Sequence, residues 1–166
     1  MALFLACKRH SGGRPDIVGS KRFITQVTGG LALLQARAPD AFSNVVKYVG
    51  RIKESDRTGM RAYETPPTFD LADTTAFYST TWCAAAMAHD SFHSKLYHDY
   101  QATNSAPVPD NIWMGRPAEA QCMSYQIDVM RKIGAPDFEI DYAKTQADGH
   151  YVNDSESWEE YKKRTW

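Results

Sequence analysis

The sequence lacks a strong charge of either sign and any long hydrophobic run. Its 19 basic and 20 acidic side chains give a formal net charge of −1, so we expect no nucleic-acid partner. No apolar run approaches the roughly 20 residues that span a bilayer, so we expect no transmembrane segment. What is present, 43% hydrophobic and 23% charged residues, is typical of a folded domain with an ordinary core.

Cysteine is also scarce, and its spacing argues against a disulfide-rich fold. Cys7, Cys83 and Cys122 form no CxxC pair and lie far apart, so we expect no disulfide framework. This pattern favours a reducing, cytoplasmic compartment. Residues 4–7 resemble the end of a lipoprotein signal, which leaves a truncated export signal as the alternative. Cys83 and Cys122 fit the role of small core residues.

The length of the chain predicts one domain preceded by an arm. Residues 8–19 are polar and contain glycine and proline, so residues 1–19 are interpreted as an N-terminal arm. Residues 20–166 are interpreted as a single domain with a polar C-terminal tail. Within that tail, Trp158 and Tyr161 could anchor a last short helix.

Several stretches have the spacing of amphipathic helices. The first begins at Ser20, a favoured N-cap residue, and a second short helix follows Pro39. A third covers about residues 80–100, and a fourth opens at Pro117 and ends at Gly134. The inward-facing stripe of the first helix is Phe23, Val27, Leu31 and Leu34. That of the third helix is Trp82, Ala85, Ala86, His89, Phe92, His93 and Leu96. That of the fourth helix is Glu119, Cys122, Met123, Gln126, Ile127, Met130 and Ile133.

The segment between residues 51 and 77 does not have this helical spacing. Turn signals occur at residues 56–59 and at two consecutive prolines. Short alternating runs at residues 60–63, 68–71 and 75–78 predict strands of a small sheet. Together with the helices, they predict an α+β fold.

A pair of histidines on the third helix is the clearest candidate site. His89 and His93 are four residues apart, so their side chains point the same way and lie roughly 6 Å apart, close enough to share a metal ion. Both fall within the apolar stripe, where a buried imidazole must pair its ring nitrogens. Zinc takes three protein ligands in catalytic sites. Glu119, on the buried stripe of the next long helix, is the expected third ligand, because an unpaired carboxylate there would be costly.

Each of these residues also has a purely structural interpretation. His89 and His93 could be core histidines that bond to the backbone or to other side chains. Glu119 could simply complement the positive N-terminal end of its helix. Asp90, directly after His89, could act as a general base or as a structural acid beside the metal. The His89-Asp90 pair also resembles metal-dependent phosphohydrolases, but the further ligands that these need are not evident.

The segment His89-Asp90-Ser91-Phe92-His93 resembles the HExxH motif of the zincin metallopeptidases, with Glu119 at the place of the gluzincin third ligand. The stretch RPAEAQCMSYQIDVMRKIGAP is also similar to the second zincin helix. The resemblance covers roughly residues 50–136. It implies a small sheet packed against a metal-binding helix and a second long helix, zinc as cofactor, and hydrolysis of a peptide or protein substrate with Asp90 as general base.

One departure from the family pattern concerns the general base. The family has Glu after the first His, whereas this sequence has Asp90, which is shorter by one methylene or about 1.5 Å of reach. A misplacement of about 1 Å can cost a hundredfold in rate. The alternative function is therefore a catalytically weak or inactive zincin-like module that binds metal or peptide. The sequence gives no indication of the oligomeric state.

Overall fold

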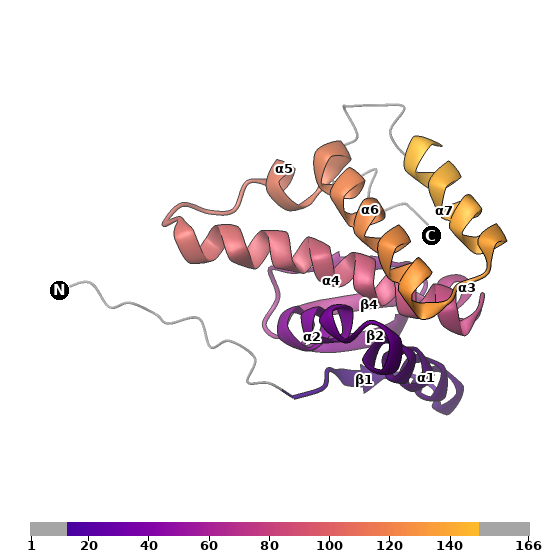
Figure 1. Ribbon diagram of the computed structural model, residues 1–166. Coiled ribbons are helices and arrows are strands. Elements are labelled where there is room, and N and C mark those ends of the chain that lie inside the picture. Colours follow the sequence, from indigo (N-terminus) through magenta and orange to yellow (C-terminus); the bar gives the residue numbers. More distant parts are fainter. Residues whose placement is uncertain (1–12, 150–166) are drawn as a thin grey trace.

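The computed structural model describes residues 13–149 (Figure 1). In chain order, the helices and strands of this part are β1 (Asp16–Val18), α1 (Lys21–Arg37), α2 (Pro39–Tyr48), β2 (Arg51–Ser55), β3 (Gly59–Arg61), β4 (Thr68–Ala72), α3 (Asp73–Ala76), α4 (Thr80–Thr103), α5 (Asp110–Trp113), α6 (Gly115–Ile133) and α7 (Asp137–Gly149). The chain is therefore α+β, as the sequence predicts.

The sheet is small and mostly parallel. Its strand order is β1-β2-β4-β3, in which β1, β2 and β4 run parallel and β3 pairs antiparallel with β4. Ile52 on β2 lies beside Ile17 on one side and Phe69 on the other, and Phe69 also lies opposite Met60 of β3. Ile52, Phe69 and Met60 are buried, so the register aligns three core side chains across the sheet.

Helix α4 lies at the centre of the molecule. It contacts α1 and α2 on one side and α6 on another, and it also contacts β3 and β4 (Figure 1). Six consecutive side chains near its start, those of residues 83–88, are all buried. A helix that is apolar around its whole circumference must be enclosed by other elements. This enclosure fixes the position of the second half of α4, which carries the two histidines.

Local sequence signals determine where the main helices begin and end. The Ser20 side chain accepts a hydrogen bond from the Phe23 backbone N–H, and Ser79 caps α4 in the same way through Trp82. Gly134 ends α6 with φ +75°, in the left-handed region that glycine adopts most easily. The expected buried stripe of the first helix is confirmed at Phe23, Val27, Leu31 and Leu34.

Some expected elements were wrong. Residues 16–18, expected in the arm, form β1. Residues 51–55 form β2, whose only buried side chain is Ile52, so no alternating pattern marked it. Residues 75–78 were expected to form a strand, but α3 runs through Ala76 and Phe77 caps it. The stretch after Pro136 forms α7. Trp158 and Tyr161 lie outside the described residues.

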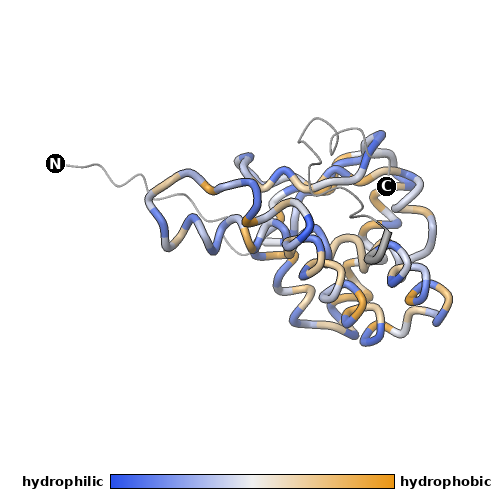
Figure 2. The backbone as a smooth tube through the Cα atoms, turned by 90° about the horizontal axis from the view of Figure 1, so that it is seen from above, coloured by the Kyte–Doolittle hydropathy of each residue, from blue (hydrophilic) through white to orange (hydrophobic). Residues whose placement is uncertain are grey.

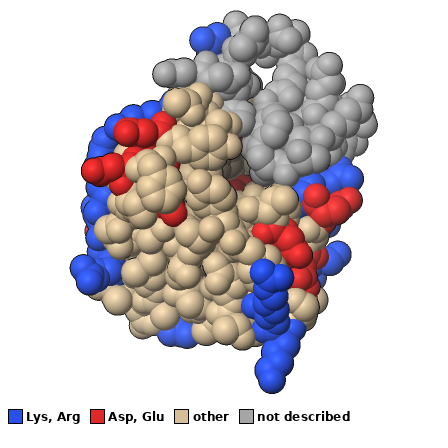
Figure 3. Space-filling model, turned by 90° about the vertical axis from the view of Figure 1, so that its right-hand side faces the viewer, with Lys and Arg blue, Asp and Glu red and all other residues tan. Residues whose placement is uncertain are grey.

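The surface and hydropathy of the described part agree with the sequence composition. Hydrophobic and hydrophilic residues alternate along the helices, as expected for elements with one buried face (Figure 2). On the face in Figure 3, Lys and Arg lie together with Asp and Glu around a largely uncharged surface. Within residues 13–149, no helix is both long enough and apolar enough to cross a membrane.

The close contact between Gly50 and Pro66 generates a test of the packing where the chain enters the neighbouring strands β2 and β4. A Cβ at Gly50 would lie only 2.4 Å from Pro66 Cβ, and the proline ring cannot rotate away. We expect Gly50→Ala to lower the free energy of unfolding by about 1–3 kcal/mol, measured by urea denaturation.

Gly29→Ala is the matched control. Its nearest new contact would be Thr80 Cγ2 at 3.9 Å, an ordinary packing distance. In the interior of α1 this change should stabilise the protein by roughly 0.5–1 kcal/mol. Equal effects of the two substitutions would contradict the packing at Gly50.

Candidate metal site

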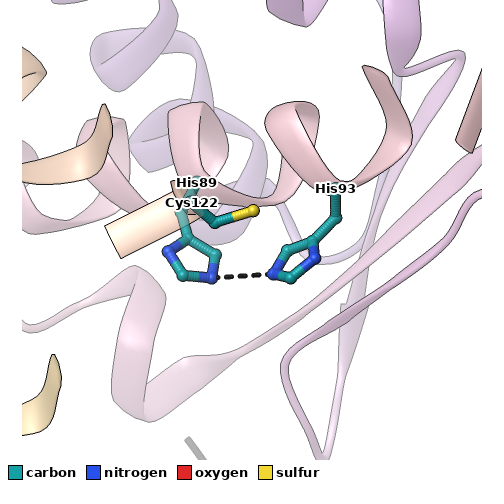
Figure 4. A group of neighbouring side chains, drawn as sticks. All are labelled: His89, His93 and Cys122. Carbon is teal, nitrogen blue, oxygen red and sulfur yellow. Dashed lines mark hydrogen bonds between the residues drawn. The ribbon is translucent and has the colours of Figure 1, made fainter. Parts of the chain in front are cut away.

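The candidate site lies where α4 faces α6. On α4, His89 and His93 are one turn apart and project toward α6. On α6, Glu119 and Cys122 are three residues apart and project toward α4, because residues at that spacing share a helix face. Figure 4 shows the two imidazoles side by side with the Cys122 thiol directed between them. Two pairs of side chains of types that can bind a metal ion thus meet between α4 and α6.

The donor atoms of three of these residues are close together. The His89 Nε2 and His93 Nε2 atoms are 3.0 Å apart, and Glu119 Oε2 lies 3.1 Å from the first and 3.4 Å from the second. Ligands about 2.0–2.1 Å from a tetrahedral zinc ion lie about 3.3–3.4 Å from one another. The 3.4 Å separation has this length, and the two shorter ones have the length of hydrogen bonds, so only a small outward shift of His89 would bring all three atoms to ligand spacing.

A backbone contact determines which nitrogen of His93 faces the site. The Nδ1 atom of His93 lies 2.6 Å from the carbonyl oxygen of Trp113 in α5. A carbonyl oxygen only accepts, so Nδ1 carries a hydrogen and donates it. In the neutral ring the Nε2 atom then keeps its lone pair, which faces Glu119 and His89. Such an outer hydrogen bond is typical of metal-ligating histidines.

Burial makes these polar groups depend on one another. The side chains of His93 and Glu119 are only 2% and 10% exposed. Burial by itself raises the pKa of Glu119, but His93 and His89 outweigh it and hold the pKa well below its usual value. Burial disfavours the protonated form of His93, yet Cys122 and Glu119 hold its pKa well above 6.5. In the metal-free site, a protonated His93 therefore pairs with the Glu119 carboxylate, and the proton supplies the positive charge between them.

Asp90 lies beside this cluster and is almost fully buried, with 5% of its surface exposed. Burial raises the pKa of its carboxyl to about 6, and the neighbouring His89 and His93 only partly oppose this. A proton acceptor works best when its pKa lies near the working pH. The pKa of Asp90 thus lies closer to neutral pH than that of an exposed aspartate.

Cys122 is the residue that the sequence interpretation assigned to the core and that the structure brings to the site. Its Sγ atom and one ring nitrogen from each of His89 and His93 lie within 4.8 Å of one another. The signal that could have found it is its spacing from Glu119, since both fall on the stripe that faces the histidines. Cys122 was not expected at the site, because a lone buried cysteine is common in protein cores.

His89, His93 and Cys122 form a group that could hold a metal ion. Imidazole nitrogens with a carboxylate or a thiolate are the ligands that zinc uses in proteins, whereas magnesium and calcium prefer oxygen atoms alone. One polar atom of the cluster, His89 Nδ1, is buried without a partner among the described residues.

Comparison of the chain with protein-family models, with curated proteins and with solved structures gave no match. The cluster of His89, His93 and Cys122 does not by itself assign the chain to the zincin family. The function therefore has to be inferred from the chemistry of the site, and the resemblance to zincins rests on the short motifs at His89–His93 and around Glu119.

The ion pair at the site predicts how the stability of the metal-free protein depends on pH. The folded pKa of His93 lies above the unfolded value of 6.5, so its contribution to stability is complete below 6.5 and is lost as the pH rises through the folded pKa. The contribution of Glu119 is complete above 4.5 and is lost only at lower pH.

With a chelator present, we expect the melting temperature of the wild type to fall relative to that of His93→Gln as the pH rises above 6.5. Differential scanning fluorimetry of both proteins measures this difference. Parallel pH profiles would contradict the raised pKa of His93.

Proposed function

We propose that this protein is a zinc-dependent hydrolase that acts on a peptide bond, with His89, His93 and Glu119 as metal ligands and Asp90 as general base. The observation that carries the proposal is the convergence of three donor atoms from largely buried side chains of α4 and α6 at separations of 3.0–3.4 Å. A shared cation would interact favourably with all three donor atoms. Burial of the same three polar groups without a positive charge among them would cost free energy.

Zinc, when bound, would supply a Lewis acid that polarises a carbonyl group and lowers the pKa of water. The remaining tasks belong to side chains of the chain. His89, His93 and Glu119 would hold the ion, and the Trp113 carbonyl would keep His93 oriented through Nδ1. Asp90 would accept a proton from water and pass it to the leaving amine.

An edge of the sheet supports a peptide as substrate. β3 is the last strand in the sheet order and pairs only with β4 among the described strands. Its other edge can add an extended peptide through backbone hydrogen bonds. Aromatic contacts connect it to the site: Tyr63, just after β3, lies edge-on to Trp113 with ring centroids 6.2 Å apart. The carbonyl of Trp113 in turn accepts from His93.

The second candidate function is a zinc-binding or peptide-binding module without turnover. The Asp90 side chain is short and buried. This favours a module without turnover, because proton transfer needs heavy atoms within about 2.6–3.2 Å. The hydrolase and the zinc-binding module require the same metal site, whereas a peptide-binding module does not, so metal binding is tested first.

Metal binding depends on residues of both helices. We expect about one zinc per chain in protein purified without a histidine tag. Glu119→Gln replaces a carboxylate by a poor amide donor, so it should lower the zinc affinity at least tenfold to a hundredfold. The measurement is a competitive zinc titration.

Asp128→Asn is the matched control, because it makes the same carboxylate-to-amide change at an exposed position of α6. It should leave the histidine pair and Glu119 in place and retain most of the zinc affinity. Wild-type affinity in Glu119→Gln would remove Glu119 from the site, and no zinc in the wild type would refute the proposed function.

Activity depends on the reach of Asp90. If its length limits the rate, Asp90→Glu should increase hydrolysis of a quenched-fluorescent peptide mixture by the zinc-loaded protein. Asp90→Asn has the same shape but cannot take up a proton, so it should abolish turnover while zinc stays bound. Turnover that survives in Asp90→Asn would exclude Asp90 as the base.

A further inference from the structure

Cys122 has three neighbours that a core cysteine does not need. Its Sγ atom lies within 4.8 Å of ring nitrogens of both His89 and His93. Glu119 precedes it by one turn on the same face of α6. The other buried cysteine of the described chain, Cys83, is equally inaccessible to solvent, but burial is the sole cause of the raised pKa of its thiol.

We propose that Cys122 is a further ligand of the zinc ion and holds the resting site closed with four protein donors. This proposal rests on the proposed zinc site and concerns its regulation. The orientation of the thiol between the two imidazoles carries the proposal (Figure 4).

The charges of the donors favour this assignment. The Glu119 carboxylate and a Cys122 thiolate together neutralise a divalent ion, and a neutral assembly is the least costly one to bury. On coordination the thiol would lose its proton to solvent, as coordinating thiols do. A thiolate ligand also favours zinc over magnesium and calcium, which prefer oxygen ligands.

The number of ligands decides what the site can do. Four-coordinate zinc with four protein donors is typical of closed sites, whereas catalytic sites keep one position for water. The Cys122 thiolate would occupy that position. Hydrolysis would begin only after the thiolate leaves and takes up a proton, with water entering in its place. Cys122 is thus expected to lower the activity of a site whose other parts suit hydrolysis.

Cobalt substitution tests the ligand directly. Cobalt(II) replaces zinc in such sites, and a thiolate ligand produces an intense sulfur-to-cobalt charge-transfer absorption in the near ultraviolet. The chain has three cysteines, so Cys7→Ala combined with Cys83→Ala leaves Cys122 alone. In a phosphine reductant, the wild type and this double variant should both show the band. Cys122→Ser should bind cobalt without the band, and its zinc affinity should fall about tenfold to a hundredfold.

The proposal and the proposed function fail in different ways. A band that persists in Cys122→Ser, or a wild type that binds cobalt without one, would overturn the role of Cys122 and leave the zinc site intact. No cobalt or zinc binding in the folded wild type would overturn both. Cys122→Ala provides a second measurement, because opening the coordination sphere should increase peptide hydrolysis above the wild type. An unchanged or lower rate with zinc bound would contradict the closed resting state.

Discussion

Two imidazoles and a carboxylate are packed between α4 and α6 with their donor atoms 3.0–3.4 Å apart, and they need a positive charge among them. That requirement shapes the surrounding structure. Without metal, a proton retained on His93 meets it, and the pKa values of His93 and Glu119 move apart accordingly. In the proposed metal-bound state, the cation would take the place of this proton, so proton and metal would compete for the site.

The rest of the fold holds this contact in place. α4 packs against α1, α2, the sheet and α6, and the Ser94 hydroxyl on its later turns donates to the Tyr48 carbonyl at the end of α2. The short helix α5 closes the connection between α4 and α6 and provides the Trp113 carbonyl to His93. Packing in one part of the molecule therefore determines hydrogen-bond geometry in another, as is usual for preorganised sites.

Much of the site could be predicted from the sequence because helical spacing is a local property. Residues four apart must share a face, so His89 and His93 were expected together, and the buried stripe on the next helix identified Glu119. The strands were harder to predict. β1 and β2 are short, and pairing with their neighbours, which depends on residues far away in the chain, is what makes them strands. Residues 75–78 have strand-like composition, yet the chain turns into α3 there.

The sequence by itself determined the main helices, their caps at Ser20 and Gly134, and the pairing of two histidines on one buried face. Those features depend on neighbours within four residues. Only the tertiary structure decided that α6 brings Cys122 as well as Glu119 against the histidines, and that Trp113 holds His93. These contacts join residues 20 to 33 positions apart, and no local spacing specifies which faces of two distant helices meet.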